Sequence, residues 1–127
     1  MNSFYSDMAK QNGSVPKDET PVNCRLPHIF QEITAERVRQ DELHPWDNLE
    51  IIMPNDEEIE WYVSEADLHK ADNNIAEACG KAEPVSLLAE ELNEIFAETD
   101  PVKQETEAIQ LAALAIKFVQ WSRAKRA

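Results

Sequence analysis

The segment from Pro101 to Arg123 places the strongest limit on how this chain can fold. On a helical wheel at about 100° per residue, the apolar side chains of "PVKQETEAIQLAALAIKFVQWSR" spread around most of the circumference. A helix that is apolar nearly all round is buried among other helices, in a bundle or at a subunit interface. Only two glycines occur in 127 residues, which disfavours an all-β chain with many tight turns. The sequence therefore predicts an all-α four-helix bundle.

Prolines and helix caps divide the rest of the chain. The helices predicted from apolar spacing cover residues 28–43, 57–79, 84–98 and 101–123. Asp56 is the expected cap of the second helix, and Gly80 is its expected stop. Pro84 and Pro101 suit the first turns of the third and fourth helices. The stretch "HPWDNLEIIMPND" breaks the pattern and predicts a loop that packs its apolar side chains against the protein.

The amino-terminal residues differ from the rest in having no sustained apolar period and several prolines. We expect a flexible or draped arm over residues 1–27, because such a segment has little apolar surface to bury. A single all-α domain over residues 28–127 follows it, since this length suits one modest core.

The net charge of the chain limits the kinds of partner that it can bind. A formal net charge of -13 opposes a phosphate backbone and predicts no nucleic-acid binding. No apolar segment is long enough for a bilayer and no signal peptide is recognisable, so we expect no membrane association and a soluble, cytoplasmic protein. Cys24 and Cys79 are too few for a zinc site. They are expected to be reduced thiols, with Cys79 in the core.

Two glutamates fall where a soluble helix normally carries its core. Glu91 lies in the apolar stripe of "LLAEELNEIFAETD", and Glu107 lies among the apolar residues of the last helix. Glu94 follows Glu91 by three residues and Gln110 follows Glu107 by three, so each pair projects from one side of its helix. If the two helices are antiparallel across the "TDP" turn, both pairs face each other. Mg²⁺ takes oxygen ligands and offsets buried carboxylate charge.

The alternative is a set of solvated helix faces. In a chain with 25 Asp and Glu residues, an EExxE string arises easily by chance. Glu90 falls on the polar side of its helix, where solvent exposure explains it. Glu91 and Glu107 are the stronger cases, because a carboxylate in a core normally has a partner.

These motifs together resemble the MazG-like all-α nucleoside triphosphate pyrophosphohydrolases. EExxE at Glu90 to Glu94 precedes ExxQ at Glu107 to Gln110. The chain is most similar to small MazG-like proteins of bacteria and phages, which carry an ERxRQD helix that reads "ERVRQDELHPW" here. The likeness continues through "IAEACGKAEPVSLLAEELNEIFAETDP" and "ETEAIQLAALAIKFVQWSR" and covers about Ile33 to Arg123.

The resemblance implies a MazG-like helical bundle, completed as a homodimer or homotetramer, that uses Mg²⁺, with Mn²⁺ as a substitute. The implied reaction cleaves a nucleotide between its α- and β-phosphates. Glu91, Glu94 and Glu107 match the family's metal ligands and catalytic carboxylates. Gln110 takes the place of an aspartate, and a neutral amide is a poorer Mg²⁺ ligand than a carboxylate.

Four further residues are candidates for substrate binding. Arg37 and Lys117 can offset phosphate charge, and His44 and Trp46 can stack on or hydrogen-bond a base. Arg39 is a weaker candidate of the same kind. The alternatives are surface ion pairs for the cations, an ordinary packed side chain for Trp46 and a capping role for His44.

Three functions are therefore open from the sequence. The first is a Mg²⁺-dependent nucleotide pyrophosphohydrolase. The second is a noncatalytic bundle that binds a nucleotide or a protein partner, which Gln110 favours. The third is a structural helical oligomer whose interface uses Phe96, Phe118 and Trp121.

Overall fold

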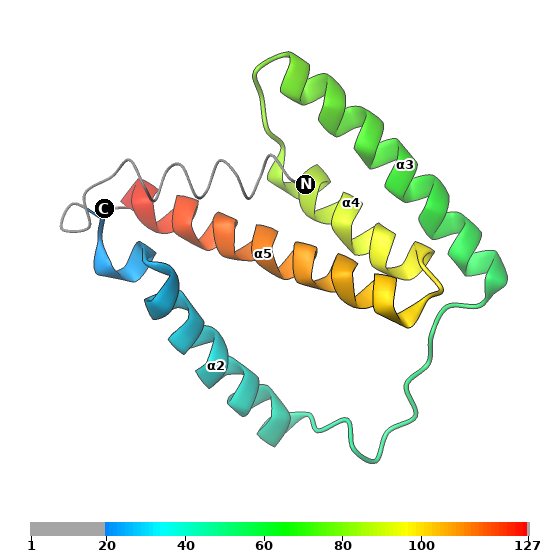
Figure 1. Cartoon of the computed structure of the whole chain (residues 1–127), viewed down its shortest axis with the longest axis horizontal. Coiled ribbons are helices and arrows are strands. Elements are labelled where there is room, and N and C mark those ends of the chain that lie inside the picture. The colour runs from blue at the N-terminus through cyan, green and yellow to red at the C-terminus, as the bar shows by residue number, and fades with distance from the viewer. Residues whose placement is uncertain (1–19, 127) are drawn as a thin grey trace. The chain divides into compact units, whose positions relative to one another are not determined.

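The computed structural model describes residues 20–126, and this part of the chain is all-helical. Its elements are the 3-10 helix η1 (Val22–Cys24) and the α-helices α2 (Leu26–Leu43), α3 (Asp56–Ala78), α4 (Pro84–Ala97) and α5 (Pro101–Arg126) (Figure 1). Over the described residues the prediction of an all-α chain is confirmed. Most of the predicted arm, residues 1–19, lies outside them.

The chain divides into two compact units. The first contains the described residues up to Glu50 together with those from Val119 onward, and the second runs from Ile51 to Phe118. α5 contributes its carboxyl-terminal end to the first unit and the rest of its length to the second. Each unit is described below by itself.

In the first unit, the end of α5 holds the start of α2. The Gln120 amide donates to the carbonyl oxygen of Cys24 at 2.9 Å, and Arg123 donates to the carbonyl oxygen of Asn23 at 2.7 Å. Arg123 also pairs with Glu32 at 2.6 Å. Cys24 and Ile29 are buried here. α2 thus begins at Leu26, two residues before the predicted start.

In the second unit, local signals fix both ends of α3. The cap is Asn55 rather than the predicted Asp56, because Asn55 Oδ1 accepts from the Glu58 N–H at 2.9 Å while Glu58 accepts from the Asn55 N–H at 3.2 Å. This reciprocal pair is a capping box. At the other end, Gly80 has a φ of 72° and donates to the Glu77 carbonyl. Gly80 therefore ends the helix as predicted.

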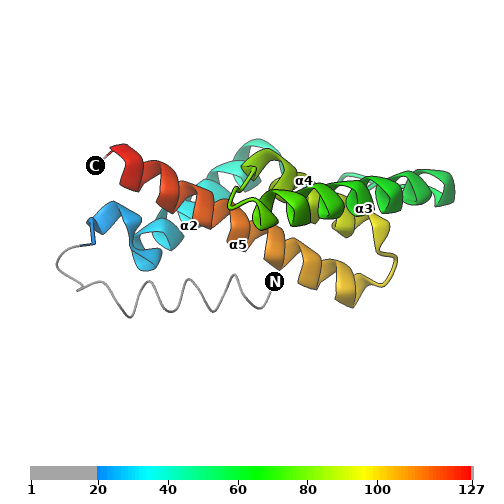
Figure 2. The same cartoon turned by 90° about the horizontal axis from the view of Figure 1, so that it is seen from above.

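α3 and α4 run antiparallel and side by side (Figures 1 and 2). The inward face of α3 follows alternating spacings of three and four residues, at Ile59, Tyr62, Ala66, His69, Asn73 and Ala76. Ala66, Asn73 and Ala76 are its buried members. His69 and Asn73 lie between Ala66 and Ala76 on this face, so the middle of the interface is polar.

A short turn joins α4 to α5. Glu98 accepts the N–H groups of Thr99 and Asp100, each at 3.0 Å, and Asp100 accepts the Val102 N–H at 3.2 Å. Asp100 therefore caps α5 as predicted. One turn into α5, the Gln104 amide donates to the Ile95 carbonyl oxygen at 3.1 Å, which sets the register of the antiparallel helices.

Two predictions of burial are wrong. In the predicted packed loop, Trp46 is 70% exposed and Ile52 is 84% exposed, and Cys79 is exposed rather than in the core. For α5, no residue is buried within the described chain, so of the two predicted settings, a bundle or a subunit interface, the subunit interface stays a prediction. A wheel reports the composition of a helix and not how many neighbours surround it. No helix in the described part is both long and apolar enough for a membrane span.

Candidate metal centre

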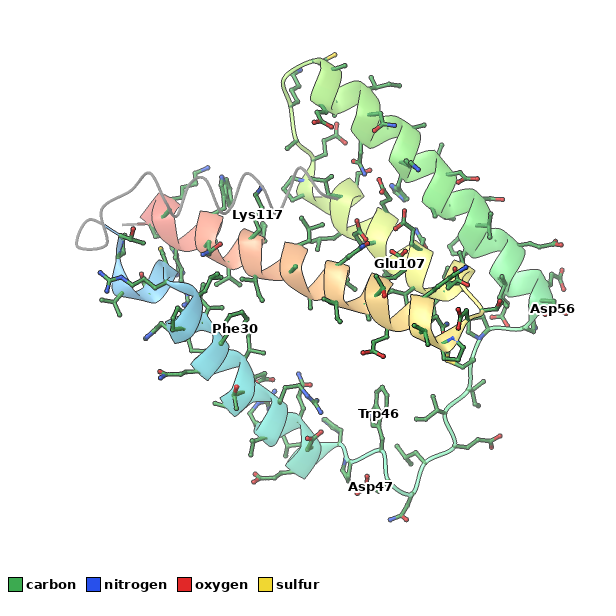
Figure 3. All side chains as sticks on the ribbon, viewed as in Figure 1. Phe30, Trp46, Asp47, Asp56, Glu107 and Lys117 are labelled. Atoms are coloured by element: carbon green, nitrogen blue, oxygen red, sulfur yellow. The ribbon has the colours of Figure 1, made fainter. Side chains whose placement is uncertain are left out.

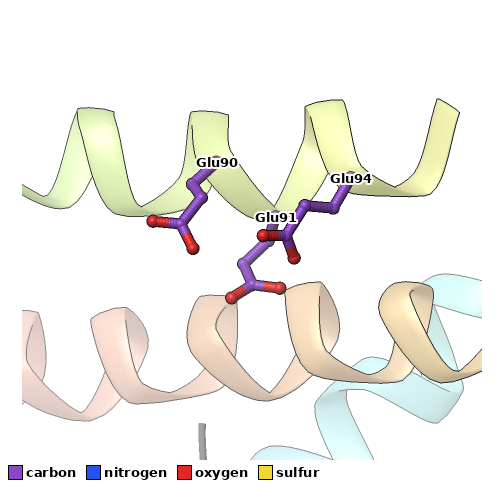
Figure 4. Close-up of side chains that lie close together, drawn as sticks. All are labelled: Glu90, Glu91 and Glu94. Carbon is purple, nitrogen blue, oxygen red and sulfur yellow. The ribbon is translucent and has the colours of Figure 1, made fainter. Parts of the chain in front are cut away.

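α4 brings three carboxylates together beside α5. Glu91 is 3% exposed, and Glu90 and Glu94 are half-buried. One carboxylate oxygen from each residue lies within 4.8 Å of the others (Figure 4). Glu90 is therefore part of the cluster, whereas the sequence placed it on the solvent side. The wheel assigned that side to solvent, but α3 covers it.

Glu107 reaches the same cluster from α5 (Figure 3). The charge of Glu107 acts on both Glu91 and Glu94, so these three carboxylates lie near one another. The acids with oxygens within 4.8 Å of one another are Glu90, Glu91 and Glu94.

The electrostatics of the cluster disfavour full ionisation. Burial, followed by the charges of Glu90 and Glu107, raises the pKa of Glu91 to about 7. The pKa of Glu94 is also raised, first by burial, then by the neighbouring carboxyl of Glu107 and by the charges of Glu91 and Glu90. At neutral pH the site therefore holds protons in the absence of a cation.

Two oxygens of the cluster are buried without any hydrogen-bond partner: Oε2 of Glu91 and Oε2 of Glu107. A buried acceptor with no donor costs on the order of 1–3 kcal/mol, and more when it is charged. A hard divalent cation would satisfy both oxygens and offset the repulsion that raises the Glu91 pKa. The donor set consists of carboxylate oxygens, which fits Mg²⁺ or Mn²⁺ and not a thiol-seeking metal.

Gln110 is half-buried on α5, one turn beyond Glu107. The Gln104 to Ile95 contact sets the register. Antiparallel helices advance equally per residue, so this register puts Gln110 at about the level of Glu90. An amide oxygen at that level can add a neutral ligand to the four carboxylates.

Behind the cluster, a polar layer joins α3 to α4. Asn73 is buried, and its amide nitrogen donates to the Ser86 carbonyl oxygen at 3.2 Å and to Glu90 Oε1 at 3.0 Å. His69 Nδ1 lies 3.0 Å from Ser86 Oγ. The sequence reasoning missed these contacts, although the three-and-four spacing along residues 59–76 contains the signal for them. Ser86 is only 7% exposed, so its pairing with His69 is a packing contact and not a nucleophilic site.

Three of the four predicted substrate-binding residues line one pocket in the first unit. This pocket measures about 840 Å³ and lies where α2 ends; its lining is Arg37, Arg39, Gln40, Asp41, His44, Pro45, Trp46 and Asp47. Trp46 and Asp47 belong to the segment that follows α2 (Figure 3). The fourth predicted residue, Lys117, is half-buried on α5 in the second unit.

Both arginines of the pocket form ion pairs within α2. Arg37 pairs with Asp41 at 2.7 Å and Arg39 pairs with Glu36 at 2.6 Å. The hydrogen bond from Arg39 lowers the pKa of Glu36 to about 2. All four side chains are exposed, so these contacts are surface pairs that add little to stability. The surface-pairing alternative thus accounts for these contacts in the absence of a ligand.

No protein-family model matches the chain, and neither a curated protein nor a solved structure matches it.

Proposed function

We propose that this protein is a divalent-cation-dependent nucleotide pyrophosphohydrolase of the MazG-like kind, which converts a nucleoside triphosphate to its monophosphate and pyrophosphate. The observation that carries the proposal is the pair of buried, unpartnered oxygens on Glu91 and Glu107. Such oxygens are costly unless something binds them, and the neighbouring acids suit a hard cation.

In this proposal Glu91, Glu94 and Glu107 hold the cation, with Glu90 and the amide of Gln110 as further oxygen ligands. A bound divalent cation supplies polarisation of a phosphoryl oxygen and makes water more acidic. The side chains of the protein perform the remaining steps. A carboxylate of the cluster accepts the proton of the attacking water, the water oxygen bonds to the α-phosphorus, and the bond to the bridging oxygen breaks.

For the nucleotide, we propose that Arg37, His44, Trp46 and Lys117 contribute binding. Trp46 offers a ring on which a base can stack, and the cations offset phosphate charge. On this proposal, Trp46→Ala raises KM with little change in kcat, because stacking on a base acts equally on ground state and transition state. The MazG-like proposal also includes assembly as a homodimer or homotetramer.

The test is a panel of nucleoside triphosphates incubated with Mg²⁺, with the products separated. We expect monophosphate and pyrophosphate in equal amounts from at least one nucleotide. Glu91→Gln should lower the rate by a factor of about 100 or more, since it removes a cation ligand that is also a candidate base. Glu105→Gln is the matched control, because Glu105 is exposed on the same helix as Glu107. Equal rates for wild type and Glu91→Gln would refute this site.

The second candidate is a noncatalytic bundle that binds a cation and a nucleotide. Gln110 favours it, because an amide in place of an acid leaves the cation with less negative charge around it. Calorimetry with Mg²⁺ and a nonhydrolysable nucleotide separates the two. Heat of binding together with no pyrophosphate from any nucleotide of the panel would select the noncatalytic function.

A further inference from the structure

The strongest feature outside the predicted site is the buried amide of Asn73. It lies on α3, whereas the carboxylates lie on α4 and α5. Only 8% of Asn73 is exposed, and its nitrogen makes two hydrogen bonds to successive turns of α4. The first goes to the backbone oxygen of Ser86 and the second to Glu90 Oε1.

The bonding pattern fixes which end of the amide faces α4. Both partners are acceptors, so only the NH₂ end of Asn73 can meet them. The other end, Oδ1, is buried and has no hydrogen-bond partner. An unpartnered buried acceptor costs on the order of 1–3 kcal/mol, so packing alone does not explain an asparagine here. The Asn73 NH₂ group is held in place by its hydrogen bond to the α4 backbone, and it donates a second hydrogen bond to the Glu90 carboxylate.

We propose that Asn73 is a positioning residue for the cation site, acting through Glu90. Its NH₂ group donates a hydrogen bond to Glu90 Oε1. This bond fixes the Glu90 rotamer that keeps a carboxylate oxygen within 4.8 Å of oxygens of Glu91 and Glu94. Partners that orient ligand carboxylates commonly change metal affinity by a factor of 10 to 100. The inference rests on the proposed function, because it assigns Asn73 to the same cation site.

A competing explanation is that Asn73 fixes the register of α3 against α4, as buried polar residues do in helical assemblies. The two roles differ in one respect. A register role does not depend on the charge of Glu90, whereas a positioning role disappears once Glu90 no longer contributes a carboxylate.

The experiment is a double-mutant cycle in which Mg²⁺ affinity is measured by calorimetry on the full chain. The variants are Asn73→Ala, Glu90→Ala and the double variant, with Asn74→Ala as the matched control on the exposed side of α3. We expect Asn73→Ala to weaken Mg²⁺ binding about tenfold in the wild-type background and less than about twofold when Glu90 is alanine. Asn74→Ala should bind as wild type does.

Asn73→Leu keeps about the volume of the side chain and repeats the test if the alanine variant does not fold. It removes the donor without adding a charge, so weaker Mg²⁺ binding is again expected. An equal loss of affinity in both Glu90 backgrounds, or no loss in either, would overturn the positioning role. Wild type that binds no Mg²⁺ would instead overturn the proposed function, so the two failures are distinguishable.

Discussion

Glu91 is the central carboxylate of the proposed cation site. Leu87, Leu88 and Ile95 lie one turn away from it on α4, its exposure is 3%, and Oε2 has no hydrogen-bond partner. Burial and the nearby acids raise its pKa to about 7, above the ordinary value of 4.5. A group whose pKa is higher in the folded state stabilises the fold below its unfolded pKa, and that contribution is lost as the pH rises through the folded pKa.

The metal-free protein should therefore be more stable at pH 5 than at pH 8. Each tenfold change in proton affinity is worth about 1.4 kcal/mol, so the loss from Glu91 over this window is on the order of 2–3 kcal/mol. Urea denaturation in the presence of a chelator, at pH 5, 7 and 8, measures it. Glu91→Gln should be the more stable protein at pH 8, and Glu105→Gln should follow the wild-type curve. A wild-type free energy of unfolding that does not change across this range would contradict the raised pKa.

Cation binding should release protons. Burial and the neighbouring acids raise the pKa of Glu91 to about 7 and also raise that of Glu94, so the cluster is partly protonated near neutral pH. A cation favours the ionised form of each ligand, so about one proton should leave per Mg²⁺ bound at pH 7. Calorimetry in two buffers with different heats of ionisation measures that number. Identical binding heats in the two buffers would mean that the carboxylates were already ionised.

The sequence predicted the positions of some side chains in the carboxylate cluster and missed others. Helical spacing predicted Glu91 and Glu94 on one side of α4, and their carboxylate oxygens do lie within 4.8 Å of each other. Glu107 acts on both through its charge from α5. The position of Glu90 was not predictable in this way. Its environment depends on α3, and no local pattern showed which face of α4 would receive that helix.

The ends of the helices follow from short-range chemistry. Pro84, Asp100 and Pro101 mark the starts of α4 and α5, and Gly80 ends α3, all of them readable from the sequence. The cap of α3 was misassigned by one residue, because adjacent Asn55 and Asp56 are both good capping residues. The wheel of α5 left two settings open, a bundle and a subunit interface, and no local pattern chooses between them because burial depends on neighbours far away along the chain or in another subunit.

Gly80 offers a direct test of the α3 boundary. Its φ of 72° is strained for any residue with a Cβ, while a Cβ built there meets nothing within 4 Å. Gly80→Ala should therefore lower the free energy of unfolding by about 1 kcal/mol through backbone strain alone. Gly80→Asn should cost less, because asparagine tolerates this conformation better. Thermal and urea unfolding of both variants measures the difference, and an alanine variant as stable as wild type would contradict the assignment.

Across the whole molecule, large apolar side chains are widely exposed. Trp46 is 70% exposed, Ile52 is 84% exposed and Trp61 is 56% exposed. Exposed apolar surface of this kind often marks an interaction site. We therefore expect a homodimer or homotetramer at micromolar concentration, as the MazG-like proposal also implies. Sedimentation equilibrium measures the mass directly, and a monomer at all concentrations up to about 100 μM would contradict this expectation.

The proposed function requires that the buried carboxylates of α4 and α5 form a divalent-cation site. Mn²⁺ titration followed by electron paramagnetic resonance tests it directly, since the signal of free Mn²⁺ reports the bound fraction. We expect saturable binding to wild type and to Glu105→Gln, and a loss of affinity by a factor of about 10 or more in Glu91→Gln. Wild type that leaves all Mn²⁺ free, or Glu91→Gln that binds it as wild type does, would contradict the claim.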